Sequence, residues 1–250
     1  MSGKSPEGPK LPGEPKPVPY LNEDRVKAVN NYLKSSADSN LSLIGYPSLL
    51  LSALLKRAAK NKQIRLALVY LVSRLKVSPV LADPGRLGSR LRTLYGFTSD
   101  IRTFVRVWGS LDYAEWAFSS LKPNVHEDEI AKWVDYIQLV ACILYQALEN
   151  VAYVGSHGII AMSPRLEARL WAISCMWWAL YVQLDFIKLL RRKDKGTKQW
   201  WRDFAVNCCY VPLSIHWSTE TGFLSDGVVG LLGTFTAYSG AFPRWTALLK

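Results

Sequence analysis

Apolar residues recur at helical spacing in the first half of the chain, with basic residues between them. The first stripe consists of Ile64, Leu68, Leu71 and Leu75. Lys62 and Arg65 fall roughly opposite it, as expected for an amphipathic helix. A second stripe consists of Ile101, Phe104, Val105, Trp108 and Leu111, and Arg102 and Arg106 lie off it. No strand-like alternation persists, so the pattern predicts an all-α fold.

Beyond residue 130 the chain contains long uncharged segments. Residues 136–148 are uncharged but too short to cross a membrane unaided, and residues 170–184 are borderline, since a spanning helix needs about 20 apolar residues. A buried core helix and an interfacial segment are alternatives for residues 170–184. Residues 204–217 and 227–243 form two further apolar segments around a polar bend at 218–226.

The last apolar segment contains Gly227, Gly230 and Gly233 at steps of three residues. In a soluble helix each glycine would cost up to ~1 kcal/mol relative to alanine. In lipid, small residues at such steps let helix backbones approach closely. We therefore predict that residues 204–250 form a C-terminal membrane hairpin or re-entrant pair. Basic residues flank both of its ends, which predicts that both chain termini face the cytosol.

The remaining boundaries follow from composition. Residues 1–20 are rich in proline and predict a disordered tail. Residues 21–120 predict a basic amphipathic helical region, with a short helix over 22–34 and a new helix beginning near Pro47. Residues 121–203 predict central apolar helices with a basic loop.

The net charge of +11 is unevenly spread. Residues 56–106 contain twelve basic and two acidic residues, and residues 188–202 contain seven basic residues and one acidic residue. Such patches attract nucleic acid or an anionic lipid surface. Because the apolar residues form continuous stripes and apolar segments follow, the pattern favours an anionic membrane over nucleic acid. The alternative is that the two amphipathic stripes simply pack on each other as a helical hairpin.

Candidate chemistry is sparse. His216 stands near Ser218 and Glu220, but an interfacial role is the better interpretation than a catalytic triad. The segment from His126 to Glu129 reads as a solvated helix start, and the residues around Glu149 and His157 as local capping and helix–helix contacts. The four cysteines (Cys142, Cys175, Cys208 and Cys209) lack metal-ligand spacing and predict buried reduced thiols. We expect no enzyme activity, no metal and no cofactor.

Four segments together resemble the peroxin-eleven family of peroxisomal membrane-elongation proteins, in a fungal form. They are "VPLSIHWSTETGFLSDGVVGLLGT" (Val211–Thr234), "NKQIRLALVYLVSRL" (Asn61–Leu75), "FTSDIRTFVRVWGSL" (Phe97–Leu111) and "LENVAYVGSHGII" (Leu148–Ile160). The resemblance covers about residues 49–245.

The resemblance implies a non-enzymatic protein of the peroxisomal membrane that elongates the organelle before division. It also implies self-association, a cytosolic import receptor for peroxisomal membrane proteins, a fission adaptor and a dynamin-type GTPase as partners. The membrane-binding side chains would be those of the two amphipathic segments: Lys62, Ile64, Arg65, Leu68, Leu71, Leu75, Arg102, Phe104, Arg106 and Trp108. The glycines at 227, 230 and 233 would serve membrane packing.

Two other functions compete with membrane remodelling. A metabolite pore or carrier, also suggested by the resemblance, should line its path with ionisable residues. Asp135, Asp185 and Lys188 are the candidates in the apolar segments. A soluble helical enzyme or adaptor is the third interpretation.

Overall fold

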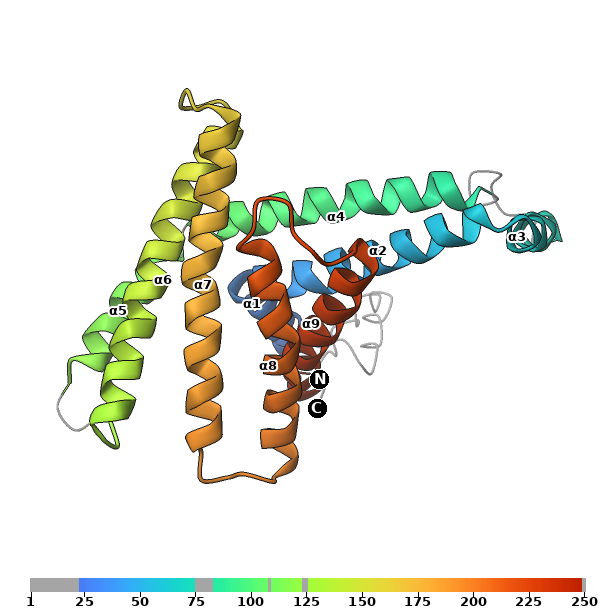
Figure 1. The fold of residues 1–250 in the computed structure, drawn as a ribbon. Helices are drawn as coiled ribbons and strands as arrows, with labels where there is room; N and C mark the ends of the chain where they lie inside the picture. The colour runs from blue at the N-terminus through green and yellow to red at the C-terminus, as the bar shows by residue number, and fades with distance from the viewer. Residues whose placement is uncertain (1–22, 75–82, 108, 123–125, 249–250) are drawn as a thin grey trace, which may run out of the picture.

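The computed structural model describes residues 23–74, 83–107, 109–122 and 126–248. Regular structure within these residues is entirely helical, which confirms the all-α prediction (Figure 1). The helices are α1 (Glu23–Ser35), α2 (Ala37–Lys60), α3 (Lys62–Arg74), α4 (Pro84–Val107), α5 (Ser110–Ser120), α6 (Glu129–Ser156), α7 (Pro164–Arg191), α8 (Lys198–Trp217) and α9 (Asp226–Leu248).

The described helices other than α3 fall into two groups that cross each other (Figure 1). We call α1, α2, α4 and α9 the lateral helices. Helix α2 packs along α4 and α9 and contacts α1. Both α2 and α4 run crosswise to α6 and α7. We call α5, α6, α7 and α8 the upright helices, since α6, α7 and α8 stand side by side with α5 against α6. The groups meet where α8 packs on α9 and where the end of α4 contacts α6.

Side-chain caps define where three of the upright helices, α6, α7 and α8, begin. The carboxylate of Asp128 accepts a hydrogen bond from the backbone N–H of Ala131 at the start of α6. Ser163 caps α7 in the same way, and Pro164 occupies its first position. The Thr197 hydroxyl accepts from the N–H of Trp200 at the start of α8. These caps satisfy N–H groups that lack helical partners, so the loops at 157–163 and 192–197 separate three distinct helices.

The prediction of a helix start near Pro47 is wrong. Pro47 lies inside α2 rather than in its first turn, because the polar run 35–40 is itself mostly helical. There, Asn40 and Ser42 donate side-chain hydrogen bonds to the carbonyls of Ser36 and Asp38, so these polar residues support the helix. The uncharged segment 136–148, expected to be too short to cross a membrane unaided, is the middle of the longer, 28-residue helix α6.

A small core lies where the two groups meet. Leu49 of α2, Leu213 of α8 and Val229 of α9 are almost completely buried against one another. Tyrosine and tryptophan rings from α2, α4 and α8 surround them. Residues 204–250 therefore do not fold as a separate hairpin: α9 follows α8 after a turn, as predicted, but packs more extensively on α2 than on α8.

The glycine pattern in α9 serves this packing on α2. A Cβ atom added at Gly230 would lie 2.5 Å from the backbone nitrogen of Leu50, and one added at Gly233 would overlap the ring of Tyr46. Gly227 faces the methyl group of Ala53 at an ordinary contact distance. The close approach predicted for Gly230 and Gly233 thus exists within this chain, between α9 and α2.

A pair of alanine substitutions tests this contact. We expect Gly230→Ala to lower thermal stability, because the α2 backbone would have to shift. Gly240→Ala, in the same helix with nothing near its Cβ position, should be neutral or stabilising by up to about 1 kcal/mol. Melting of both variants in detergent, followed by circular dichroism, checks this. Equal effects would show that close approach at Gly230 does not matter.

Candidate functional site

The outward face of α6 is apolar. Exposed side chains recur every three to four residues along it: Ile130, Trp133, Ile137, Val140, Ile143, Ala147 and Val151. The opposite face contacts the rest of the protein and holds Gln138, Gln146 and Glu149, all buried, among small residues such as Ala141. A helix in water carries the reverse arrangement, with its polar face outward. The exposed surface of α6 is therefore suited to lipid.

The length of this apolar face fits a bilayer. From Ile130 to Val151 it covers 21 helical steps, or about 31 Å at 1.5 Å per residue. The hydrocarbon core of a membrane is about 30 Å thick. The neighbouring helix α7 also exposes apolar residues, among them Ile173, Met176 and Ile187. Among the described residues, α6 and α7 are the two helices long and apolar enough to cross a membrane.

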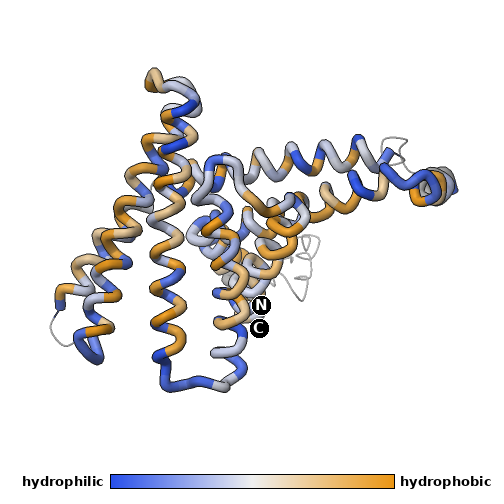
Figure 2. Tube along the Cα trace, viewed as in Figure 1, coloured by the Kyte–Doolittle hydropathy of each residue, from blue (hydrophilic) through white to orange (hydrophobic). Residues whose placement is uncertain are grey.

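Charged residues lie toward the two ends of the α6–α7 pair. Between these ends, hydrophobic residues recur along both helices (Figure 2). Segments 136–148 of α6 and 170–184 of α7 carry no charge and lie beside each other in the antiparallel pair. At one end Lys188 of α7 lies 3.7 Å from Asp135 of α6 and donates a hydrogen bond to Gln138. Such an uncharged middle between charged ends is typical of membrane-embedded helices.

The first amphipathic stripe lies on α3, which projects from the end of α2 (Figure 1). Ile64, Leu66 and Tyr70 are exposed, as are Lys62 and Arg65. Helix α3 packs against α2 and makes no comparable contact with α4 within the described residues, so the two stripes do not form the helical hairpin considered above. Leu68 and Leu71 belong to α3, but their side chains, like the whole of Leu75, lie outside the described residues.

The second stripe is divided between surface and interior. Phe104 of α4 is exposed, whereas Trp108 lies outside the described residues. Arg102 and Arg106 face the interior: Arg102 pairs with Asp38 at 3.0 Å, and Arg106 with Asp38 at 3.1 Å and with Glu149 at 2.7 Å. The prediction that these two arginines bind headgroups is therefore corrected, because their guanidinium groups hold α4 against α2 and α6.

Glu149 is the most enclosed member of this ion-pair network, with its side chain 5% exposed. Its carboxylate accepts two hydrogen bonds from Arg106 and one, of 2.8 Å, from the hydroxyl of Tyr145. A buried carboxylate is tolerated only when paired and hydrogen-bonded in this way. The network thus allows α6 to carry a charge on its inner face while its outer face stays apolar.

His216 organises the turn between α8 and α9 rather than a catalytic site. Its Nδ1 atom accepts hydrogen bonds from the backbone N–H groups of Phe223 (2.8 Å) and Leu224 (2.9 Å). Gly222 packs directly under the imidazole ring with a positive φ of 66°. An accepting Nδ1 requires an unprotonated nitrogen, and partial burial lowers the pKa of His216 below its usual 6.5, against a smaller opposing influence of Asp226.

This lowered pKa predicts a pH-dependent turn. The folded state disfavours His216 protonation, so its stabilisation is complete above about pH 6.5 and is lost as pH falls toward the folded-state pKa. We expect the melting temperature to drop between pH 7.5 and pH 5.5, and to drop less in His216→Gln. Thermal melts of both proteins across this range check it. An identical pH dependence in the variant would rule out His216 as the responsible group.

The remaining candidate groups are possible metal ligands and the four cysteines. No group of three or more histidine, cysteine, aspartate or glutamate side chains within the described ranges is placed to hold a metal ion. The four cysteines are free thiols, but only Cys142 is fully buried and Cys208 is exposed, so the prediction of buried thiols is correct in part.

Sequence reasoning missed the outward face of α6. The signal was present, because its apolar residues recur every three to four positions from 130 to 151.

Comparison with known proteins agrees with this geometry. The family model for peroxisomal biogenesis factor 11 (PEX11) matches residues 47–200. An uncharacterized protein of Schizosaccharomyces pombe is 38% identical over 103 residues, which are 41% of this chain and 54% of that protein. The chain thus spans about half the length of this curated relative. No solved structure matches.

The family match confirms the resemblance noted in the sequence, and the yeast relative agrees with a fungal origin. The match to the family model ends at residue 200, so the segment 211–234 lies outside the matched region. Members are peroxisomal biogenesis factors, and together with the two apolar helices this indicates a protein of the peroxisomal membrane. The chain therefore belongs to the peroxisomal biogenesis factor 11 (PEX11) family.

Proposed function

We propose that this protein is a non-enzymatic remodelling factor of the peroxisomal membrane, which anchors itself through α6 and α7 and deforms one leaflet with α3. The observation that carries the proposal is the reversed polarity of α6, with apolar residues outward and Gln138, Gln146 and Glu149 inward. If α6 and α7 cross the bilayer, the crosswise α2 and α4 run along the membrane plane (Figure 1).

Helix α3 is the element that inserts into one leaflet in this proposal. It extends from the lateral helices with Ile64 and Leu66 exposed beside Lys62 and Arg65. A basic helix with exposed apolar residues binds at the headgroup layer, where each cation near an anionic leaflet contributes about 1 kcal/mol. Insertion into one leaflet would expand that leaflet and favour curvature. Family membership extends the proposal to self-association and to contacts with an import receptor, a fission adaptor and a dynamin-type GTPase.

Vesicle tubulation by the full-length protein tests whether α3 deforms the membrane by insertion. We expect wild-type protein to tubulate anionic vesicles, and Leu68→Glu combined with Leu71→Glu to abolish tubulation. The control, Gln63→Glu with Ser73→Glu, adds the same charge off the predicted stripe and should retain most activity. Electron microscopy of the vesicles gives the answer. Tubulation by the stripe variant at the wild-type level would contradict the proposal.

A metabolite pore is less well supported. Asp135 and Lys188 pair with each other, and Asp185 lies within one turn of Lys188, so all three gather at one end of the α6–α7 pair. A conducting path should carry ionisable or polar groups along its length. Loss of a bilayer conductance in Asp185→Ala would favour the pore instead.

A further inference from the structure

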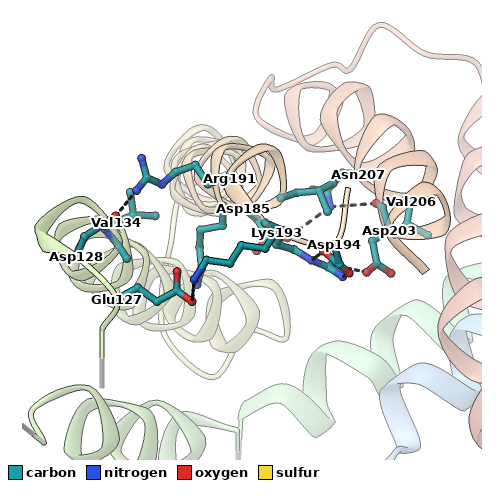
Figure 3. A pocket seen from close by; sticks show the side chains of 14 residues that line it. Glu127, Asp128, Val134, Asp185, Arg191, Lys193, Asp194, Asp203, Val206 and Asn207 are labelled. Carbon is teal, nitrogen blue, oxygen red and sulfur yellow. Dashed lines mark hydrogen bonds and ion pairs between the residues drawn. The ribbon is translucent and has the colours of Figure 1, made fainter. Parts of the chain in front are cut away.

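A cavity of about 720 Å³ opens at one end of the upright helices. It lies between the start of α6, the end of α7, the α7–α8 loop and the first turns of α8 (Figure 3). In the proposed orientation this end is the membrane–water boundary, where lipid headgroups reside. Val134, Leu189 and Val206 give the cavity an apolar wall next to its charged groups.

Most charges in the cavity neutralise one another. Its four cations are Lys188, Arg191, Arg192 and Lys193, and its five carboxylates are Glu127, Asp128, Asp185, Asp194 and Asp203. Arg191 pairs with Asp128, Lys193 with Glu127, and Arg192 with both Asp194 and Asp203. Lys188 pairs with Asp135, outside the cavity.

Asp185 is the exception. It forms no ion pair with any described residue, and its one hydrogen bond is a long one, 3.5 Å, from the side-chain amide of Asn207. Figure 3 shows Asp185 between the Arg191–Asp128 pair and the Asp194–Asp203 side. Asp185 is only partly buried, and because it has no cation partner among the described residues, its carboxylate is available to accept charge-assisted hydrogen bonds from a cation outside the chain.

The chemistry of the wall restricts what that cation can be. Quaternary ammonium groups are held by aromatic cages, and none of the described residues lining the cavity is aromatic. A primary ammonium instead donates charge-assisted hydrogen bonds to a carboxylate. The side chain of Lys193 is 86% exposed, and its ion pair with Glu127 is long, at 3.5 Å. Lys193 can therefore turn to a phosphate nearby.

We propose that this cavity binds the headgroup of a phospholipid with a primary ammonium, as in phosphatidylethanolamine. Asp185 and the side-chain oxygen of Asn207 accept hydrogen bonds from the ammonium, Lys193 faces the phosphate, and the acyl chains run along the apolar outer surface of α6 and α7. This inference rests on the proposed membrane anchoring of α6 and α7.

The test is lipid retention by the full-length protein. The protein is reconstituted into bilayers holding equal amounts of phosphatidylethanolamine and phosphatidylcholine with identical acyl chains, extracted in mild detergent, and its bound lipid is measured by native mass spectrometry. We expect the wild-type protein to enrich phosphatidylethanolamine, and Asp185→Asn to reduce that enrichment about tenfold, as loss of one charge-assisted hydrogen bond implies. Asp112→Asn, in α5 and outside the cavity, should retain it.

The outcomes separate this proposal from the anchoring on which it rests. If the protein resists carbonate extraction but retains both lipids equally, or if Asp185→Asn keeps the enrichment, the headgroup site is wrong and the anchoring stands. If the protein dissolves without detergent and binds neither lipid, both are wrong. Matching elution volume and helicity for all variants excludes misfolding as the cause.

Discussion

Val140→Asp combined with Ile143→Asp is expected to release the protein from membranes into the carbonate-soluble fraction. Both side chains are exposed in the middle of α6, and an aspartate near the centre of a spanning helix costs about 2.5–3.5 kcal/mol for insertion. Two of them would cost about 5–7 kcal/mol, enough to prevent stable integration. Fractionation of the organelle after carbonate treatment measures the effect.

The same substitution distinguishes an outer face of α6 that contacts lipid from one that contacts water. In water, aspartate at these exposed positions would change stability by less than about 0.5 kcal/mol and would improve solubility. Ile159→Asp with Ile160→Asp is the matched control, because both residues lie exposed in the α6–α7 loop. It should leave integration intact. If the α6 variant stays in the membrane as firmly as this control, the outward face of α6 does not meet lipid.

Arg106→Met is expected to lower the free energy of unfolding by about 3 kcal/mol or more. The substitution keeps much of the side-chain volume but leaves the carboxylate of Glu149 buried without its cation, which is the costly way to break an ion pair. Adding Glu149→Gln should recover most of the loss, because the amide is uncharged and its oxygen still accepts from Tyr145. Chemical unfolding in detergent, monitored by tryptophan fluorescence, measures both.

Arg92→Met provides the comparison. Arg92 pairs with Asp226 at 3.0 Å, but both side chains are about half exposed, and such pairs contribute about 0–1 kcal/mol. A loss in Arg106→Met no larger than that in Arg92→Met, or a double variant as unstable as Arg106→Met, would show that the network does not join the lateral and upright helices.

The sequence predicted the features that depend on local spacing. Helical periodicity predicted the all-α fold and a helix over the first apolar stripe, which includes α3. Gly230 and Gly233 approach α2 closely, and their role in membrane packing stays a prediction. The sequence pattern favoured the segments after residue 204 as the membrane hairpin, whereas among the described residues the helices long and apolar enough to cross a membrane are α6 and α7. The charged residues inside α6 interrupted the apolar run and hid its continuous outer face.

Long-range pairing was beyond sequence reasoning for a physical reason. Arg102 and Arg106 look like surface cations because their partners, Asp38 and Glu149, lie more than forty residues away. Whether an arginine faces headgroups or a buried carboxylate depends on which helices meet, and periodicity does not contain that information. The same holds for the cavity near Asp185, which three segments of the chain build together: residues 127–134, 185–194 and 203–207.

The central claim is that lipid covers the outer face of α6, and site-directed spin labelling measures it most directly. In a cysteine-free background, nitroxides at Ile137, Val140, Ile143 and Ala147 of the reconstituted protein should be accessible to oxygen dissolved in the bilayer and shielded from a water-soluble nickel complex. A label on the loop at Ile159 should give the reverse. Ready access of the nickel complex to all four α6 positions would mean that water surrounds this helix.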